Sequence, residues 1–271
     1  MSKDLLVCVR CHTKPTFILD TVDSVKWSCG GDTTEVVLAV DAVENLATKL
    51  RTVMGKKNVY CSPKKWGWGA GLFCLLVESI VYFEKRFDFS HFLSIDYDTL
   101  FIRKNVDLEL LSFVDSPSVG LVGNYSATNN TWAERFNKER KTLEQVFGRV
   151  PVSFIPGEGI QGGCMLLTKS LIEVMRNRGM FRPPFSEAKN HTGIADDHLL
   201  PMFVRMCGLD LVDSGAVTRC QWKATSDPRG LEKRGICVFH PTKLKPGPVG
   251  SDIAEKQIRN YFRRIRKQAP I

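Results

Sequence analysis

Short apolar runs alternate with segments of helical period along this chain. The apolar runs have the length of buried strands and lie at 5–9, 35–40, 58–61, 91–95 and 119–122. The segments with apolar residues at helical spacing lie at 16–26, 43–53 and 72–86. This alternation is typical of a mainly parallel sheet flanked by helices, because parallel neighbours need a crossover connection between them. We therefore predict an α/β fold of the Rossmann type.

The second half of the chain continues the alternation. A loop rich in Gly and Pro at 156–159 precedes an apolar run at 162–167. Ser170 and Glu173 have the spacing of a capping box, which predicts a helix that opens there and stops at Gly179.

Another helix is expected after the paired aspartates at 196–197, and Pro201 is compatible with it only in the first turn. A late strand at 236–239 is followed by a final helix. The chain has no internal repeat and no low-complexity linker. We expect one domain over residues 1–250, with a basic helix over 251–271 that packs on this domain or extends from it.

The composition predicts a soluble protein of the reducing cytoplasm. No run of eighteen apolar residues occurs among the 271 residues, so no transmembrane helix is expected. The apolar run at 5–9 is too short for the core of a signal peptide. The nine cysteines are odd in number and scattered, and the one C-x-x-C, Cys8 to Cys11, has no second pair at zinc spacing. Reduced, structural cysteines are the expectation.

The positive charge is concentrated near the C-terminus. The chain carries a net charge of +9, and the residues from Lys243 onward contribute +6 of it. A cationic helix favours a polyanionic partner because neutralising phosphates releases counterions. DNA is therefore a candidate partner of this helix, and a solvated surface helix is the alternative.

Acidic residues follow two predicted strands and precede a predicted helix. Asp41 ends the second strand, Asp96 and Asp98 follow the fourth, and Asp196 and Asp197 open a helix. In open α/β sheets, ligands bind at the carboxyl ends of the strands. Two carboxylates at positions i and i+2 converge on one point and repel each other unless a cation lies between them. Mg²⁺ or Mn²⁺, which prefer oxygen ligands and often share them with a diphosphate, fit this pattern.

The order of these motifs resembles that of the GT-A glycosyltransferases. Asp96-Tyr97-Asp98 is similar to the D-x-D motif that holds the metal on the diphosphate of a nucleotide-sugar donor. Gln161-Gly162-Gly163-Cys164 resembles the small-residue loop on the acceptor side. Ile194-Ala195-Asp196-Asp197 resembles the x-E-D segment, although it reads Asp-Asp in place of Glu-Asp, and Cys237-Val238-Phe239-His240 resembles the strand whose histidine completes the metal site.

The resemblance implies a GT-A-like single domain that transfers a sugar from a UDP-sugar to a hydroxyl acceptor. It places Asp96, Asp98 and His240 on the metal, and assigns the acceptor's proton to Asp197, with Asp196 as second choice. The residues that it places around the sugar donor are Val9, Arg10, Asp41, Trp66, Asp96, Tyr97, Lys243 and Lys245. The residues that it places on the acceptor side are Gly162, Gly163 and Trp68. The acceptor is predicted to be a hydroxymethylated pyrimidine flipped out of DNA or, otherwise, a glycan.

Several of these residues have ordinary structural alternatives. His240 has the alternative of a buried core histidine, and Asp196 and Asp197 that of helix N-caps. Trp66 and Trp68 alternate with glycines, so they are suited to stacking on a sugar or a base, with core packing as the alternative.

Two other functions compete with sugar transfer. Asp96-Tyr97-Asp98-Thr99 mimics the D-x-D-x-T of haloacid-dehalogenase-like phosphatases, but in that family the motif follows the first strand. A non-catalytic nucleic-acid-binding protein would use the basic tail, but it leaves the acidic strand ends without a role.

Overall fold

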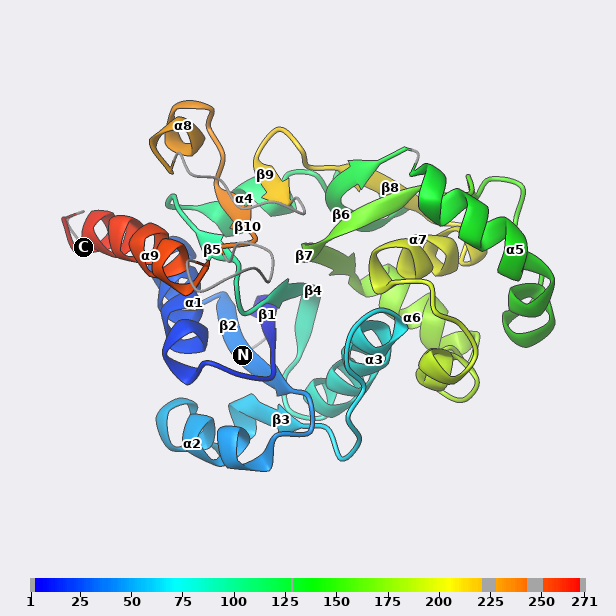
Figure 1. Ribbon diagram of the computed structural model, residues 1–271, viewed down its shortest axis with the longest axis horizontal. Helices are drawn as coiled ribbons and strands as arrows, with labels where there is room; N and C mark the ends of the chain where they lie inside the picture. The colour runs from blue at the N-terminus through cyan, green and yellow to red at the C-terminus, as the bar shows by residue number, and fades with distance from the viewer. Residues whose placement is uncertain (1–2, 128, 221–227, 243–250, 269–271) are drawn as a thin grey trace.

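The computed structural model describes residues 3–127, 129–220, 228–242 and 251–268, with the backbone alone at 251–254 and 268. A sheet of seven strands runs through the middle of the molecule, in the order β3-β2-β1-β4-β7-β6-β8 (Figure 1). The strands are β1 (Lys3–Cys11), β2 (Thr34–Val40), β3 (Val59–Cys61), β4 (Phe89–Asp96), β6 (Val119–Ser126), β7 (Gly159–Thr168) and β8 (Asp210–Asp213).

All of these strands point the same way except β7, which is antiparallel to both of its neighbours, β4 and β6. The prediction of a mainly parallel α/β sheet in one domain is confirmed. The reversal of β7 has a consequence for the site. Its first residues, and not its last, lie at the edge where the parallel strands end, since Cys164 is paired with Ile95. The glycines at the start of β7 therefore face the carboxyl end of β4.

Helices cover both faces of the sheet, which explains why its strands are apolar runs without a polar face. One core joins the helices α3 (Ala70–Glu84) and α7 (Asp196–Met206) to sheet residues such as Leu6 and Cys8. The other joins α1 (Pro15–Ser28) and α2 (Glu44–Met54) to the alternate sheet residues, such as Leu5 and Val7. Successive side chains of β1 thus enter opposite cores, as the twofold period of a strand requires.

A second, small sheet lies beyond the carboxyl ends of the main strands. It has the order β5-β10-β9, made of β5 (Leu100–Phe101), β10 (Val238–His240) and β9 (Thr218–Cys220). The helices α8 (Pro228–Lys233) and α9 (Ser251–Gln268) contribute to a third core with β5 and β10, and α9 lies beside α1 (Figure 1). The sequence predicts β10 at 236–239 but not β5 or β9, which are too short to show a period.

The remaining elements are α4 (Val106–Leu111), α5 (Asn130–Phe147), α6 (Lys169–Asn177) and the 3₁₀ helices η1 (Lys56–Asn58) and η2 (Phe185–Asn190). In the part of the chain that is described, no helix is long and apolar enough to cross a membrane.

Two predictions of local structure are wrong. The cap of helix α6 is Thr168 and not Ser170: the helix begins at Lys169, and Thr168 Oγ1 accepts a hydrogen bond from the Leu171 amide at 3.3 Å. The predicted stop at Gly179 fits, because the helix ends at Asn177 and Gly179 follows its C-cap with a φ of +75°. The strand β7 runs up to Thr168, so the helix starts as soon as the strand ends. Pro201 lies in the second turn of α7, not the first, because that helix begins at Asp196.

Candidate functional site

A cleft of about 590 Å³ opens at the carboxyl ends of β1, β2 and β4. Its wall includes residues from the ends of these strands, from the start of β7, from the loop before α3 and from the first turn of α7. Volumes of this size are typical of small-molecule sites. Predicted residues that line the cleft are Arg10, Asp41, Trp68, Asp96, Tyr97, Asp98, Gly162, Asp196, Asp197 and His240.

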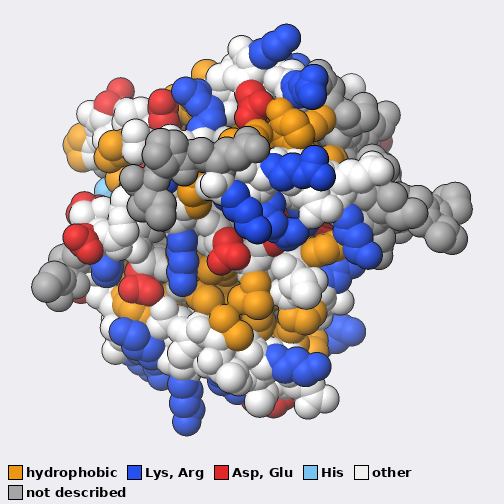
Figure 2. Space-filling view, turned by 90° about the vertical axis from the view of Figure 1, so that its left-hand side faces the viewer, with side chains coloured by type: hydrophobic (Ala, Val, Ile, Leu, Met, Phe, Trp, Pro, Cys, Tyr) orange, Lys and Arg blue, Asp and Glu red, His pale blue; other side chains and the backbone are white. Residues whose placement is uncertain are grey.

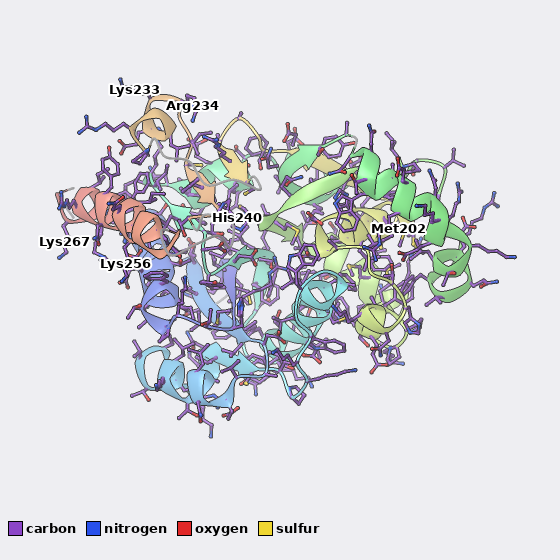
Figure 3. The ribbon with its side chains drawn as sticks, viewed as in Figure 1. Met202, Lys233, Arg234, His240, Lys256 and Lys267 are labelled. Carbon is purple, nitrogen blue, oxygen red and sulfur yellow. The ribbon has the colours of Figure 1, made fainter. Side chains whose placement is uncertain are left out.

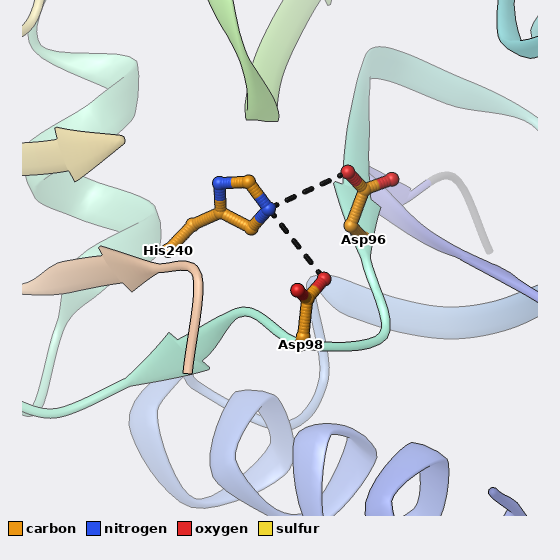
Figure 4. A group of neighbouring side chains, drawn as sticks. All are labelled: Asp96, Asp98 and His240. Carbon is orange, nitrogen blue, oxygen red and sulfur yellow. Dashed lines mark ion pairs between the residues drawn. The ribbon is translucent and has the colours of Figure 1, made fainter. Parts of the chain in front are cut away.

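Asp96, Asp98 and His240 come together in one corner of this cleft. Asp96 ends β4, Asp98 follows in the turn, and His240 ends β10 in the small sheet. The Nε2 atom of His240 lies 3.6 Å from Asp96 Oδ2 and 3.5 Å from Asp98 Oδ1 (Figure 4). One ligand atom from each residue lies within 4.8 Å of the others. Two carboxylates and an imidazole are a suitable ligand set for Mn²⁺, so the residues present fit a divalent cation.

A glycine of β7 makes room for His240. Gly163 has a φ of +94°, and a Cβ atom placed on it would lie 2.3 Å from Cγ of the imidazole. A side chain at this position would therefore displace the ring. The neighbouring Gly162 differs, since a Cβ atom there would meet nothing within 4 Å. The two predicted glycines thus have separate roles: one fits the histidine, and the other borders open space in the cleft.

Arg10 connects the corner of Asp96, Asp98 and His240 to the first turn of α7. Its guanidinium is 2% exposed and donates from Nε to Asp96 Oδ1 at 3.1 Å and from Nη1 to Asp196 Oδ2 at 2.6 Å. This buried ion pair occupies one carboxylate oxygen of Asp196. Burial raises the pKa of Asp196, whereas the positive charge of Arg10 opposes that rise.

Asp197 has a different environment from its neighbour. Burial and the nearby charge of Asp196 raise its pKa to about 8. Its Oδ1 atom accepts no hydrogen bond from the described residues, and His198 Nε2 lies 3.9 Å away. Burial lowers the pKa of His198. A carboxyl with this pKa, at the wall of a cleft, is suited to exchange a proton near neutral pH.

The alternative in which these two aspartates cap α7 is wrong. The N-cap position belongs to Ala195, and Asp196 and Asp197 occupy the first turn. Negative side chains in the first turn interact favourably with the helix dipole, so the position is compatible with their charge.

The predicted residues on the sugar-donor side are distributed unevenly. Asp41 accepts hydrogen bonds from the backbone amides of Trp66 at 2.7 Å and Gly67 at 2.8 Å, so it fixes the loop before α3. Trp66 is 5% exposed, packs in the core and does not line the cleft, whereas Trp68 is 60% exposed and does. Val9 is fully buried in the core between β1 and its helices, so its side chain does not reach the cleft.

The backbone around Tyr97 is hydrogen-bonded on both sides. Its amide donates to the carbonyl of Arg10 at 3.1 Å, and its carbonyl accepts from Thr21 Oγ1 at 2.6 Å. The predicted residues Lys243 and Lys245 lie outside the described residues.

The cleft also contains residues that were not predicted. His12, Lys65 and Gln161 all line it. Each stands within two positions of a predicted residue, so the signal was their place in the loops at the strand ends. Their types alone, a histidine, a lysine and a glutamine in polar surroundings, do not distinguish them from surface residues.

No protein-family model matches this chain, and a search of curated proteins finds no match either. Among solved structures, a mannosyltransferase from Pyrobaculum calidifontis in complex with GDP-Man and Mn²⁺ is similar over 100% of this chain, with a TM-score of 0.53 and 14% identity. The chain spans 66% of that protein's length.

Two further structures align at lower TM-scores. Mouse xyloside xylosyltransferase 1 has a TM-score of 0.47 and 14% identity over 93% of this chain and 99% of its own. A galactosyltransferase in complex with donor and acceptor sugar analogues has a TM-score of 0.46 and 10% identity over 95% of each chain. The fold is that of the GT-A glycosyltransferases, as the order of the motifs predicts.

Proposed function

We propose that this protein is a metal-dependent glycosyltransferase that uses a nucleotide-sugar donor. The observation that carries the proposal is the group formed by Asp96, Asp98 and His240 at the wall of a cleft of nucleotide size. Asp96 ends a strand of the main sheet and His240 ends a strand of the small sheet, 144 positions further along the chain (240 − 96). Two carboxylates this close repel each other, and a cation held between them and the imidazole would remove that repulsion.

The residues that line the cleft would have different tasks on its two sides. Asp96, Asp98 and His240 would hold Mn²⁺ or Mg²⁺, and a bound cation neutralises the charge that develops on a leaving diphosphate. Asp41 holds the loop of Trp66 and Gly67 against the mouth of the cleft. This fixes the wall against which the nucleotide would lie.

Asp197 is the residue best placed to receive the proton of an acceptor hydroxyl. Both aspartates line the cleft, but Oδ2 of Asp196 is bound by Arg10, whereas Asp197 has no such partner on Oδ1 among the described residues and has its pKa raised to about 8. A base whose pKa lies near the working pH combines a deprotonated fraction with enough basicity to accept the proton. In this account Asp196 is a partner of Arg10 and not the base.

The proposal is tested by nucleotide release. Purified protein is incubated with UDP-sugars and with GDP-sugars, with and without Mn²⁺, and the free nucleoside diphosphate is measured. We expect slow, Mn²⁺-dependent hydrolysis of at least one sugar donor even without acceptor. A UDP-sugar remains our prediction from sequence. Release that is unaffected by chelation of the metal would contradict the proposal, and cleavage of a generic phosphate ester would favour the phosphatase alternative, whose motif stands after a first strand rather than after β4.

For the acceptor we propose a hydroxymethylated pyrimidine in DNA, with a glycan as the alternative. The support for DNA is the exposed basic side chains on α8 and α9. Figure 3 labels Lys233 and Arg234 on and just after α8 and Lys256 and Lys267 on α9, and Figure 2 shows Lys and Arg side chains over the face of the molecule turned to the viewer. These four side chains are exposed. Phosphate contacts of this kind give salt-dependent binding.

A duplex-binding titration decides between the two acceptors. The variant Lys256→Gln/Lys267→Gln is expected to bind duplex DNA more weakly at low salt and to show a shallower salt dependence than the unchanged protein. Lys138→Gln/Lys141→Gln is the matched control, because it removes two exposed lysines from α5, which lies at the opposite end of the molecule from α8 and α9 (Figure 1). Equal affinity of the double variant and the unchanged protein would remove the argument for DNA and leave a glycan acceptor.

A further inference from the structure

The helix α9 buries one of its arginines completely. Arg259 is 1% exposed, although a charged side chain is almost never fully buried unless it is paired. Its five N–H groups meet five acceptors. These are Glu255 Oε1 at 3.1 Å, Asp20 Oδ2 at 2.9 Å, Thr21 Oγ1 at 3.3 Å, the Tyr97 carbonyl at 2.9 Å and Thr242 Oγ1 at 3.2 Å. A lysine has at most three donors and no planar fork, so it cannot replace this set.

One of these acceptors belongs to the candidate metal site. Tyr97 is the middle residue of Asp96-Tyr97-Asp98, and its carbonyl receives Arg259 Nη2 at 2.9 Å and Thr21 Oγ1 at 2.6 Å. The next carbonyl, that of Asp98, accepts the Thr242 amide at 2.8 Å. The peptide planes on either side of Asp98 are therefore fixed by α1, α9 and the residues after β10. The direction of the Asp98 carboxylate depends on those planes.

Ion pairs hold α9 in this place. Asp20 of α1 is 3% exposed and accepts hydrogen bonds from Arg259, Arg263 and Arg266. Glu255 is fully buried and pairs with Lys14 at 3.3 Å and with Arg259 at 3.1 Å. A buried charge that loses its partner is strongly destabilising, so each of these pairs resists displacement of the helix. Part of the positive charge of α9 is thus neutralised inside the molecule.

We propose that Arg259 is a positioning residue for the metal site, and that α9 acts on this site through Arg259. Arg259 orients the Tyr97–Asp98 peptide, and through it the carboxylate of Asp98, without touching the metal or the nucleotide. The inference rests on the proposed function, since it assigns a purpose to the turn that would bind the cation. It gives α9 a role that a separate basic arm would not have.

The test is Mn²⁺ affinity in three variants. Mn²⁺ is titrated, with free Mn²⁺ followed by electron paramagnetic resonance, in the presence of UDP and, in a second series, of GDP. Arg259→Lys and Arg259→Met are expected to bind Mn²⁺ about 10- to 100-fold more weakly, the usual loss when a partner behind a metal ligand is removed. Arg263→Gln is the matched control, expected within twofold of the unchanged protein, because Arg263 pairs with the same Asp20 but does not contact the turn.

A fourth variant removes the other side-chain donor to the Tyr97 carbonyl. Thr21→Val preserves shape and changes no residue of α9, but it removes the hydroxyl that lies 2.6 Å from the Tyr97 carbonyl. The same hydroxyl lies 2.9 Å from the Thr99 carbonyl and accepts from Arg259 Nη1 at 3.3 Å, so the variant also removes one of the five acceptors of Arg259. We expect a smaller loss of Mn²⁺ affinity in the same direction. Its result decides the matter if the Arg259 variants do not fold, as judged by circular dichroism and thermal unfolding.

The outcomes separate the two proposals. Unchanged Mn²⁺ affinity in folded Arg259→Lys and in Thr21→Val would overturn the positioning role, and so would an equal loss in Arg263→Gln, which would reduce Arg259 to an anchor of the helix. If the unchanged protein binds no Mn²⁺ with either nucleotide, the proposed function itself fails, and the positioning role with it.

Discussion

The two sides of the cleft are built in different ways. On the side that we propose holds the metal, the turn of Asp96-Tyr97-Asp98 is hydrogen-bonded to β1, α1, α9 and the segment after β10. On the acceptor side, Trp68 is 60% exposed, and a Cβ atom on Gly162 would meet nothing within 4 Å. The metal side is preorganised for one chemical task, since fixed groups need no rearrangement when charge develops. The side that we propose holds the acceptor leaves open space beside Gly162 and Trp68.

Removal of a metal ligand should cause the largest loss of activity. The substituted residue, Asp98, lies on the hydrogen-bonded side of the cleft. Asp98→Asn keeps the shape of the side chain but removes its charge at the candidate cation site. A metal supplies several kcal/mol of stabilisation to a leaving group, and each 1.36 kcal/mol is tenfold in rate, so we expect Mn²⁺-dependent hydrolysis of the sugar donor to fall by about 10³-fold. If a folded Asp98→Asn variant retained more than a tenth of the activity, Asp98 would not be an essential metal ligand.

Asp197 tests whether the acceptor side has one residue of comparable importance. Asp197→Asn should lower transfer to acceptor by about 10²-fold or more, the usual contribution of a general base. In the unchanged protein the rate of transfer should rise toward pH 8, because the pKa of Asp197 is raised to about 8 and the deprotonated form is the active one. An unaltered transfer rate in the variant, across this pH range, would show that Asp197 takes no proton.

The same carboxyl gives a stability prediction in metal-free buffer. The folded protein keeps the proton of Asp197 up to about pH 8, whereas an unfolded aspartate loses it near its ordinary pKa of about 3.9. Folded protein therefore binds more protons over this window, and its free energy of unfolding falls as pH rises through it. Asp197→Asn should remove this part of the fall, so that the variant unfolds at a higher temperature than the unchanged protein at pH 8. A variant that is less stable at pH 8 would contradict the raised pKa.

The two adjacent glycines at the start of β7 allow the two sides of the cleft to be compared, because Gly163 adjoins His240 and Gly162 adjoins open space. Gly163→Ala would place its Cβ 2.3 Å from the imidazole of His240, at a φ of +94°, so we expect Mn²⁺ affinity to fall about 10- to 100-fold. Gly162→Ala is its control, with open space around the added methyl, and should change Mn²⁺ affinity less than twofold. Isothermal titration calorimetry with Mn²⁺, in the presence of a nucleoside diphosphate, measures the Mn²⁺ affinity of both variants. Similar losses in the two variants would mean that His240 is not the reason for Gly163.

Trp68 should show the smallest effect. Loss of an exposed aromatic face costs about 1 kcal/mol of stacking, so Trp68→Ala should raise the acceptor KM about fivefold and change the free energy of unfolding by less than about 0.5 kcal/mol. Trp66→Ala, in the buried neighbour, should instead destabilise the fold by about 3 kcal/mol or more. Steady-state kinetics and thermal unfolding distinguish the two. A Trp68→Ala variant with unchanged acceptor KM would remove this residue from the acceptor side.

The sequence predicts the sheet and the acidic strand ends because both depend on local pattern. The buried run at 91–95 followed by Asp96 and Asp98 indicates a strand end with two carboxylates, and the structure has them there. The reversal of β7 is not visible in the pattern, since a buried strand reads the same in either direction. Of the small sheet only β10 is predicted, because β5 and β9, with two and three residues, are too short to show a period.

The roles that depend on distant contacts could not be predicted from spacing. Arg259 reads as one more charge in a basic tail, and its partners Asp20 and Tyr97 are 239 and 162 positions away. Trp66 and Trp68 look alike in sequence, yet one is buried and the other exposed. Nothing in the local pattern tells which of two alternating aromatic residues faces the core.

A crystal soaked with Mn²⁺ and a nucleoside diphosphate would show whether Asp96, Asp98 and His240 bind the metal. Anomalous scattering locates Mn²⁺ without reference to the protein density. The account predicts one strong anomalous peak within coordination distance of carboxylate oxygens of Asp96 and Asp98 and of Nε2 of His240, with diphosphate density beside it in the cleft. A peak at another place, or a diphosphate bound away from these three residues, would contradict it.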